Sequence, residues 1–184
     1  MADSKLVIVD ECLVPRRLTY LNYKGPDPMA FLKDYGTALR FIFDVSTTRV
    51  RQKKLLWDYT GDPIRFYIEH VINKEFSRFS TMIVSIRTIG HIYKTKNEGD
   101  FSTEMYGHIE NTFDPSNWFT KYVWLFYNYI FYKKVREGYI QMCRNYIQAY
   151  LNWAKEKYNL KTVTTAEAEV ANFEDDLARE AAPL

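Results

Sequence analysis

The chain has 184 residues, a length that suits one domain with a core of its own. Aromatic residues make up 17% of it, including 15 tyrosines, and tyrosine in such numbers predicts a partly wet pocket or a contact surface. The formal net charge is +2, and even the more basic part of the chain is only moderately basic, which disfavours nucleic acid as the partner.

The two cysteines, Cys12 and Cys143, are far apart in the chain and form no CxxC pattern. This spacing argues against a disulfide framework and against a zinc cluster. We interpret Cys143 as a small apolar residue on a helical stripe. The N-terminus has charged residues ahead of a short apolar run and lacks the anatomy of a signal peptide. We therefore expect a cytoplasmic protein.

Charge is distributed unevenly along the chain. Residues 162–184 hold six acidic residues against the single base Arg179, so residues 1–161 carry a net positive charge. Residues 164–167 match a capping box, and apolar residues then recur at helical spacing. We expect a single ligand-binding domain of residues 1–161 and an acidic amphipathic tail of residues 162–184. The tail either docks on the body or a second subunit, or stays disordered.

Strand patterns fill the first part of the chain. Residues 5–14 and 18–23 are rich in Leu, Val, Ile and Tyr, which predicts one long strand or two consecutive strands. The sequence Gly25-Pro-Asp-Pro28 breaks this pattern. Apolar residues then recur every three or four positions as far as Phe43, which predicts a helix that begins at Pro28.

Two hairpins are predicted next. Residues 50–59 and 64–73 flank the turn Thr60-Gly-Asp-Pro63, and the second of them alternates apolar and polar residues as a half-buried antiparallel strand does. Residues 79–93 and 101–113 are further strand segments, separated by a polar loop that contains a glycine.

Residues 118–158 contain no proline and predict one long closing helix. From Val135 onward the apolar residues step by three and four, so one broad face is expected to be buried. The segment Trp118–Tyr132 is apolar nearly all round, and we expect the rest of the protein to cover it. It is shorter than the ~20 residues that cross a bilayer, and Lys133 and Lys134 end it, so no transmembrane segment is predicted.

The element order predicts an α+β fold: a curved antiparallel β-sheet wrapped around a long C-terminal α-helix, with one shorter helix after the first strand. With Trp57-Asp-Tyr-Thr-Gly-Asp-Pro63 and Gly99-Asp-Phe101 as strand ends flanked by turns, this order resembles the helix-grip architecture of the START-like (SRPBCC) superfamily. That superfamily includes polyketide cyclases, aromatase-like proteins, Bet v 1-like proteins and lipid-transfer domains. The resemblance covers most of residues 5–158.

The resemblance implies a cavity between the sheet and the C-terminal helix that binds a hydrophobic or aromatic, lipid-like small molecule. The residues expected to line it are Trp57, Phe66, Ile68, His70, Met82, Val84, Ile86, Met105, Tyr122, Phe126 and Tyr129. An ordinary core position is the competing interpretation for each of them. Members of the superfamily share no catalytic set, so no catalytic residue is carried over. An enzyme of the cyclase or hydrolase type that uses the same cavity is the alternative function.

The sequence contains no phosphate-binding loop, dinucleotide fingerprint, serine-hydrolase elbow or HExxH motif, so we predict no cofactor and no metal. His70 lies among apolar residues, where a histidine needs a partner or is desolvated. We hypothesise that it orients a polar ligand head or transfers a proton together with Arg87 or Glu104; a satisfied core histidine is the alternative. Glu104, His108 and Glu110 share one strand face, interpreted as solvated, with a metal site as the weaker alternative.

Three kinds of macromolecular partner are also considered. One basic cluster precedes Leu55 and consists of Arg49, Arg51, Lys53 and Lys54. Two further basic residues, Arg16 and Arg17, lie beside Tyr20 and Tyr23. Nucleic acid is disfavoured, because an alternating strand places such charges on its wet face. Peripheral membrane contact through residues 118–132 is another hypothesis, and apolar surface on a soluble protein makes a homodimer the third.

Overall fold

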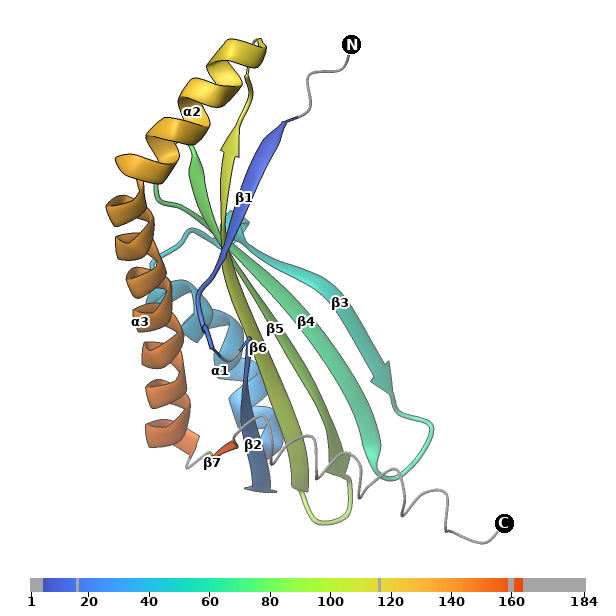
Figure 1. The fold of residues 1–184 in the computed structure, drawn as a ribbon. Helices are drawn as coiled ribbons and strands as arrows, with labels where there is room; N and C mark the ends of the chain where they lie inside the picture. The colour runs from blue at the N-terminus through green and yellow to red at the C-terminus, as the bar shows by residue number, and fades with distance from the viewer. Residues whose placement is uncertain (1–4, 16, 116, 159–160, 164–184) are drawn as a thin grey trace, which may run out of the picture.

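The computed structural model describes residues 5–15, 17–115, 117–158 and 161–163. Its elements are β1 (Leu6–Glu11), β2 (Leu18–Pro26), α1 (Pro28–Ile42), the 3-10 turn η1 (Thr47–Arg49), β3 (Val50–Asp58), β4 (Ile64–Glu75), β5 (Ser80–Tyr93), β6 (Glu98–Phe113), α2 (Trp118–Ile130), α3 (Lys133–Tyr158) and β7 (Lys161–Val163). They form an α+β fold in which the long helix α3 follows an antiparallel sheet (Figure 1).

Within the described residues, seven strands form one sheet in the order β3-β4-β5-β6-β2-β7, and β1 also pairs with β6. Strand β6 is long enough to hold both neighbours along one edge. Leu6 of β1 lies opposite Phe113, and Leu18 of β2 lies opposite Tyr106. The N-terminal segment is therefore two consecutive strands, one of the two alternatives that the sequence predicted. The predicted hairpins β3–β4 and β5–β6 are confirmed.

One face of the sheet carries the core. Alternation along β5 and β6 buries Met82, Val84 and Ile86 together with Met105 and Ile109. Helices α1 and α3 lie on the same side of the sheet (Figure 1) and cover this face. The apolar spacing of α1 buries side chains one turn apart, as predicted.

The prediction of one closing helix is wrong, because the segment is broken between α2 and α3. The Tyr132 hydroxyl lies 3.0 Å from Ser77 Oγ and 3.1 Å from Ser80 Oγ, which ties the break to the turn before β5 and the start of that strand. Asn117 caps α2 by accepting a hydrogen bond from the backbone N–H of Thr120 at 2.8 Å. Helix α2 projects past the sheet (Figure 1), so the prediction that its apolar side chains are covered is also wrong.

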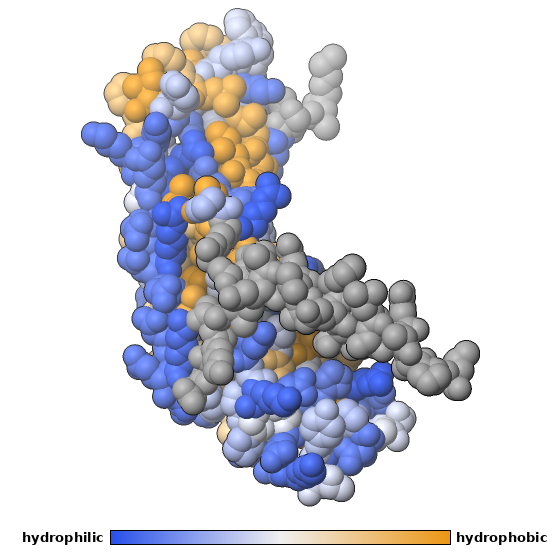
Figure 2. Space-filling view, turned by 60° about the horizontal axis from the view of Figure 1, so that its bottom comes forward, coloured by the Kyte–Doolittle hydropathy of each residue, from blue (hydrophilic) through white to orange (hydrophobic). Residues whose placement is uncertain are grey.

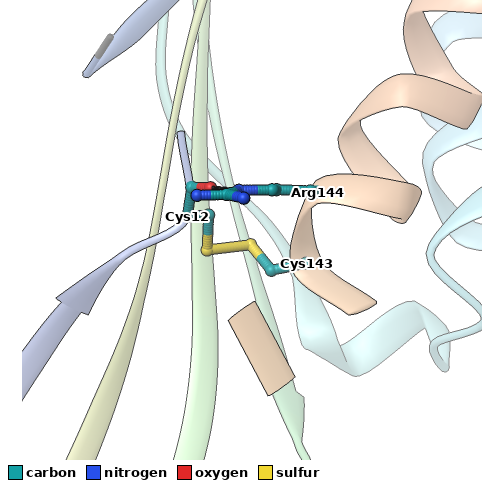
Figure 3. The surroundings of a disulfide bond; sticks show 3 residues. All are labelled: Cys12, Cys143 and Arg144. Atoms are coloured by element: carbon teal, nitrogen blue, oxygen red, sulfur yellow. Dashed lines mark hydrogen bonds between the residues drawn. A yellow bond between two sulfur atoms is a disulfide. The ribbon is translucent and has the colours of Figure 1, made fainter. Parts of the chain in front are cut away.

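A disulfide joins Cys12, at the corner between β1 and β2, to Cys143 on α3 (Figure 3). The prediction against a disulfide is therefore wrong. The two cysteines are 131 positions apart in sequence, and only the tertiary fold brings their Cα atoms to 5.8 Å. Arg144 strengthens this connection between α3 and the β1–β2 corner, because its Nε donates a hydrogen bond to the Cys12 carbonyl oxygen at 2.6 Å. Gly107 of β6 permits the close approach, since a Cβ there would lie 2.8 Å from Ile147 Cδ1.

A partly buried polar network holds the α2–α3 junction against the sheet. Arg136 of α3 donates two hydrogen bonds to the carboxylate of Asp10 on β1, one of them from Nε at 2.7 Å. Asn111 of β6 donates to the same carboxylate at 2.8 Å and accepts from Ser80 Oγ at 2.6 Å. Arg136 also donates to Asn128 of α2 at 2.7 Å. These contacts fix the angle at which α2 leaves α3.

The last described residues extend the sheet. Strand β7 pairs with β2, with Thr162 opposite Leu21, and the division into a domain of residues 1–161 and a tail of residues 162–184 stays a prediction. The predicted tail helix lies in residues 164–184, outside the described residues. No helix in the described part of the chain is both long and apolar enough to span a bilayer.

Candidate ligand-binding groove

A groove of about 570 Å³ lies between α1 and the strands β3 and β4, and we call it the α1 groove. Its volume falls within the ~300–1,000 Å³ typical of small-molecule sites. Its apolar lining is Met29, Leu32, Val50, Leu55, Trp57 and Ile68, and its polar lining includes Lys33, Tyr35, Thr37, Arg40, Thr47, Gln52 and His70. Gly36 completes the α1 side. The groove therefore combines an apolar wall with a small set of polar groups.

A β-bulge decides which residues of β3 face the groove. The register of β3 against β4 shifts between Gln52 and Lys54, so Gln52 lies opposite His70 and Leu55 lies opposite Ile68. A regular strand would turn Gln52 and Leu55 to opposite faces, because side chains alternate. The shift brings both of them to the groove.

Aromatic rings form part of the groove lining. The Trp57 ring stacks on Phe66 with centroids 5.4 Å apart. The rings of Tyr35, from α1, and His70, from β4, meet edge to face with centroids 5.0 Å apart. These contacts connect the helix to the strands and hold polar ring atoms in fixed positions.

Two of the polar atoms in this lining are buried and unpaired. Trp57 Nε1 and His70 Nδ1 have no hydrogen-bond partner in the part of the chain that the structure describes, whereas the buried Tyr35 hydroxyl interacts with Thr88. A buried polar atom without a partner costs roughly 1–3 kcal/mol, and most such atoms in proteins are paired. Two of them around one groove indicate positions that a ligand or its bound water would satisfy.

Burial sets the protonation of two polar groups in the lining, His70 and Tyr35. It lowers the pKa of the His70 imidazole below its ordinary value and raises the pKa of the Tyr35 hydroxyl. Both side chains are therefore neutral at pH 7. A neutral imidazole offers one donor and one acceptor nitrogen, and a tyrosine hydroxyl offers both roles. The groove thus suits a ligand that carries a hydrogen-bonding group.

On the α1 side, the rim of the groove has two cationic side chains, Lys33 and Arg40, with open space between them at Gly36. Lys33 and Arg40 are exposed and lie on the same helical face as Gly36. Neither cation forms an ion pair within the described residues. A Cβ at Gly36 would meet no atom within 4 Å, so this helical turn leaves room beside the rim. The charges favour an anionic ligand group.

The structure divides the residues that the sequence placed in one cavity. Trp57, Ile68 and His70 line the α1 groove, and Phe66 is buried beneath the ring of Trp57. The other seven do not line it. Met82, Val84, Ile86 and Met105 are fully buried core, and Tyr122, Phe126 and Tyr129 are exposed on α2. The groove lies under α1 and not under the C-terminal helix.

The proposed partnership of His70 with Arg87 or Glu104 is wrong. His70 is opposite Ile86 in the sheet, and its neighbour Glu69 is opposite Arg87, so His70 and Arg87 point to opposite faces. Arg87 Nη1 instead pairs with Glu104 at 3.4 Å on the face away from the helices.

The other polar sets considered from the sequence are mostly paired. His108 Nε2 lies 3.5 Å from Glu110, and no group of three His, Cys, Asp or Glu side chains among the described residues is placed to hold a metal ion. In the basic cluster, Arg49 pairs with Glu75 at 2.8 Å and Lys53 with Glu69 at 3.4 Å.

Sequence reasoning missed the whole α1 side of the groove. The signal available was Gly36, a glycine within a helical pattern where it costs about 1 kcal/mol relative to alanine. Such a residue indicates a packing or functional reason. Its neighbours Lys33 and Arg40, one turn away on each side, mark the same face.

Known proteins offer no guide to this groove. No protein-family model matches the chain, and no curated protein or solved structure matches it. Function is therefore inferred from the chemistry of the groove itself.

Proposed function

We propose that the protein binds a small amphipathic molecule in the α1 groove, with an apolar body and a polar, preferably anionic, head. The observation that carries this proposal is the pair of buried polar atoms, Trp57 Nε1 and His70 Nδ1, that belong to the lining of one groove and have no partner in the described residues. A ligand that bonds to them recovers hydrogen bonds that the empty groove lacks.

The distribution of apolar and charged groups supports the orientation of the ligand. Leu55, Ile68 and Trp57 supply apolar contact on the strand side. Lys33 and Arg40 supply positive charge on the α1 side. Removing apolar ligand surface from water contributes about 25 cal/mol per Å², and the rim cations select the charge of the head.

We also propose that the fold is a variant of the helix grip. The support is the order of elements, with a long helix after an antiparallel sheet and packed on its inner face. Two features distinguish this chain from the expected pattern. The closing segment is split into α2 and α3, and the candidate site lies under α1.

The cytoplasmic location expected from the sequence stays a prediction. The Cys12–Cys143 disulfide weighs against it, because structural disulfides persist mainly in oxidising compartments.

Calorimetric titration with dodecanoate, an apolar chain with a carboxylate head, tests the binding proposal. The informative variant is Gly36→Leu, which places a side chain into the groove, and the matched control is Gly138→Leu. Gly138 is also a helical glycine with no atom within 4 Å of an added Cβ, but it does not line the groove. Both changes improve helix propensity, so neither should unfold the protein.

We expect wild type and Gly138→Leu to bind dodecanoate equally and Gly36→Leu to bind at least about tenfold more weakly, because blocking the groove removes more than 1.4 kcal/mol of contact. Dodecanol should bind more weakly than dodecanoate to the wild type, because it lacks the charge that Lys33 and Arg40 attract. Equal affinities for all three proteins would contradict the α1 groove as the site.

A further inference from the structure

Helix α2 presents an apolar surface to solvent. Trp118 is 73% exposed and Tyr129 is 79% exposed. At about 100° per residue, the exposed apolar side chains of α2 cover roughly half of the helix circumference. We call this set the α2 surface, and its members are Trp118, Phe119, Tyr122, Val123, Phe126, Tyr127, Tyr129 and Ile130. Figure 2 shows apolar residues gathered at the end of the molecule that carries α2.

The opposite side of α2 is anchored to the body. Trp124 is buried and stacks on Phe113 of β6 with ring centroids 5.0 Å apart. Asn128 is buried and accepts a hydrogen bond from Arg136 at 2.7 Å. Helix α2 therefore cannot turn its apolar half inward without breaking these contacts. The side chains of the α2 surface are held outward, where they are available to a partner.

Charge identifies the kind of partner. The sequence from Asn117 to Arg136 contains no Asp or Glu, and Lys133 and Lys134 follow α2 directly. Glu137 is the nearest acid on the C-terminal side, and it lies 4.0 Å from Lys133 in an exposed pair, which contributes little. The α2 surface is therefore aromatic and flanked by positive charge, which complements an anionic surface.

The residue types favour a lipid surface over a second copy of this chain. Tryptophan and tyrosine prefer the headgroup level of a bilayer, where the ring meets apolar chains and the polar tip meets water. Lysines at that level interact with anionic headgroups. A two-fold dimer through α2 would instead bring the lysines of both copies to one interface, where like charges repel.

We propose that the α2 surface binds the interface of a membrane containing anionic phospholipid. Helix α2 has 13 residues, about 20 Å at 1.5 Å per residue, so it lies along the headgroup region and does not cross it. The body of the protein, with the α1 groove, stays in water beside the membrane.

Co-sedimentation of the full chain with vesicles tests this proposal. Vesicles of phosphatidylcholine alone are compared with vesicles that also contain phosphatidylglycerol. The test variant is Phe126→Ser combined with Tyr129→Ser. The matched control is Phe41→Ser, because Phe41 on α1 is 78% exposed but lies outside the α2 surface. Circular dichroism shows whether each variant keeps its fold.

We expect the wild type and Phe41→Ser to sediment with the anionic vesicles, and more weakly with phosphatidylcholine alone. The double variant should lose at least about tenfold in partition coefficient, because each aromatic side chain that leaves water contributes about that factor. Trp118 fluorescence should shift to the blue on binding, and Trp118→Phe should remove the shift.

Three results would overturn the proposal. The first is no sedimentation of the wild type with either vesicle. The second is sedimentation that the double variant retains. The third is a wild-type dimer, measured by sedimentation velocity without lipid, that the same double variant dissolves, since a second copy would then cover the α2 surface.

Discussion

The same face of one sheet is closed under α3 and open under α1. Under α3 the space is filled, because Met105, Ile109 and Ile147 are fully buried and Gly107 lets the helix approach closely. Under α1 a groove of about 570 Å³ remains, with unpaired polar atoms on Trp57 and His70 in its lining. One half of the face stabilises the fold, and the other half is available for binding.

This difference between the two halves of the face shows how one half of a sheet can stabilise the fold while the other half keeps a binding groove open. The disulfide and the Asp10–Arg136 contacts both act on α3, which lets the closed half supply stability. The open half then retains unpaired polar groups at a cost that the closed half offsets. Changes under α3 should therefore affect stability and leave ligand binding intact, whereas changes under α1 should do the reverse.

The largest expected effect on stability comes from the disulfide. Replacing Cys12 and Cys143 together by alanine opens a loop of 131 residues, and we expect unfolding free energy to fall by roughly 2–5 kcal/mol, chiefly because the unfolded chain gains entropy. Urea unfolding of the double variant, and of the wild type with and without reductant, measures this. Dodecanoate binding by the folded variant should be unchanged, and a reductant without effect on the wild type would contradict the role of the disulfide.

The next largest effect is expected at Arg136. The Arg136→Met variant leaves the carboxylate of Asp10 without its charged partner in a site where that side chain is only 14% exposed, and breaking such a pair costs about 3 kcal/mol. Urea unfolding again provides the measurement. The matched control is Lys157→Met, because the Lys157–Asp34 pair at 2.6 Å is about half exposed and its loss should cost much less than the loss of the Arg136–Asp10 pair. Equal costs for both variants would show that burial of the pair is unimportant.

The smallest effect is expected from the titration of His70. Burial holds the pKa of its imidazole below the ordinary value, so the unfolded chain binds the proton first as pH falls. The contribution of neutral His70 to the unfolding free energy is fully present above about pH 6.5. It is lost as the pH falls toward the pKa of His70 in the folded protein. The unfolding free energy of His70→Gln should fall less between pH 7 and pH 5 than that of the wild type. Parallel pH profiles for the two proteins would contradict the burial of a neutral His70.

Local sequence patterns were sufficient for much of the fold. Period-two alternation located β4 and β5, the turn Thr60-Gly-Asp-Pro63 located a hairpin, and Pro28 marked the start of α1. These signals act between residues close in sequence, where backbone geometry alone decides. The break between α2 and α3 left no such signal, because contacts of Tyr132 with Ser77 and Ser80, more than fifty positions away, hold it.

The candidate site was less accessible to sequence reasoning. His70 and Ile68 were found because they lie on β4, a strand with clear alternation, and Trp57 was found at the end of the neighbouring strand, before a recognisable turn. The apolar α2 segment was misplaced because hydrophobicity predicts burial but does not say whether the protein itself or a partner provides the cover. Likewise, the pairing of Cys12 with Cys143 depends on a long-range approach of α3 to the sheet, which spacing in the sequence does not reveal.

Native mass spectrometry on the purified chain tests the central claim most directly. Spectra of wild type, Gly36→Leu and Gly138→Leu are compared under gentle ionisation, and any adduct is released by denaturation and its mass measured. The binding proposal predicts an amphipathic adduct, or dodecanoate after its addition, on wild type and Gly138→Leu but not on Gly36→Leu. Spectra without an adduct on any of the three proteins, even with added dodecanoate, or an adduct that Gly36→Leu retains, would contradict it.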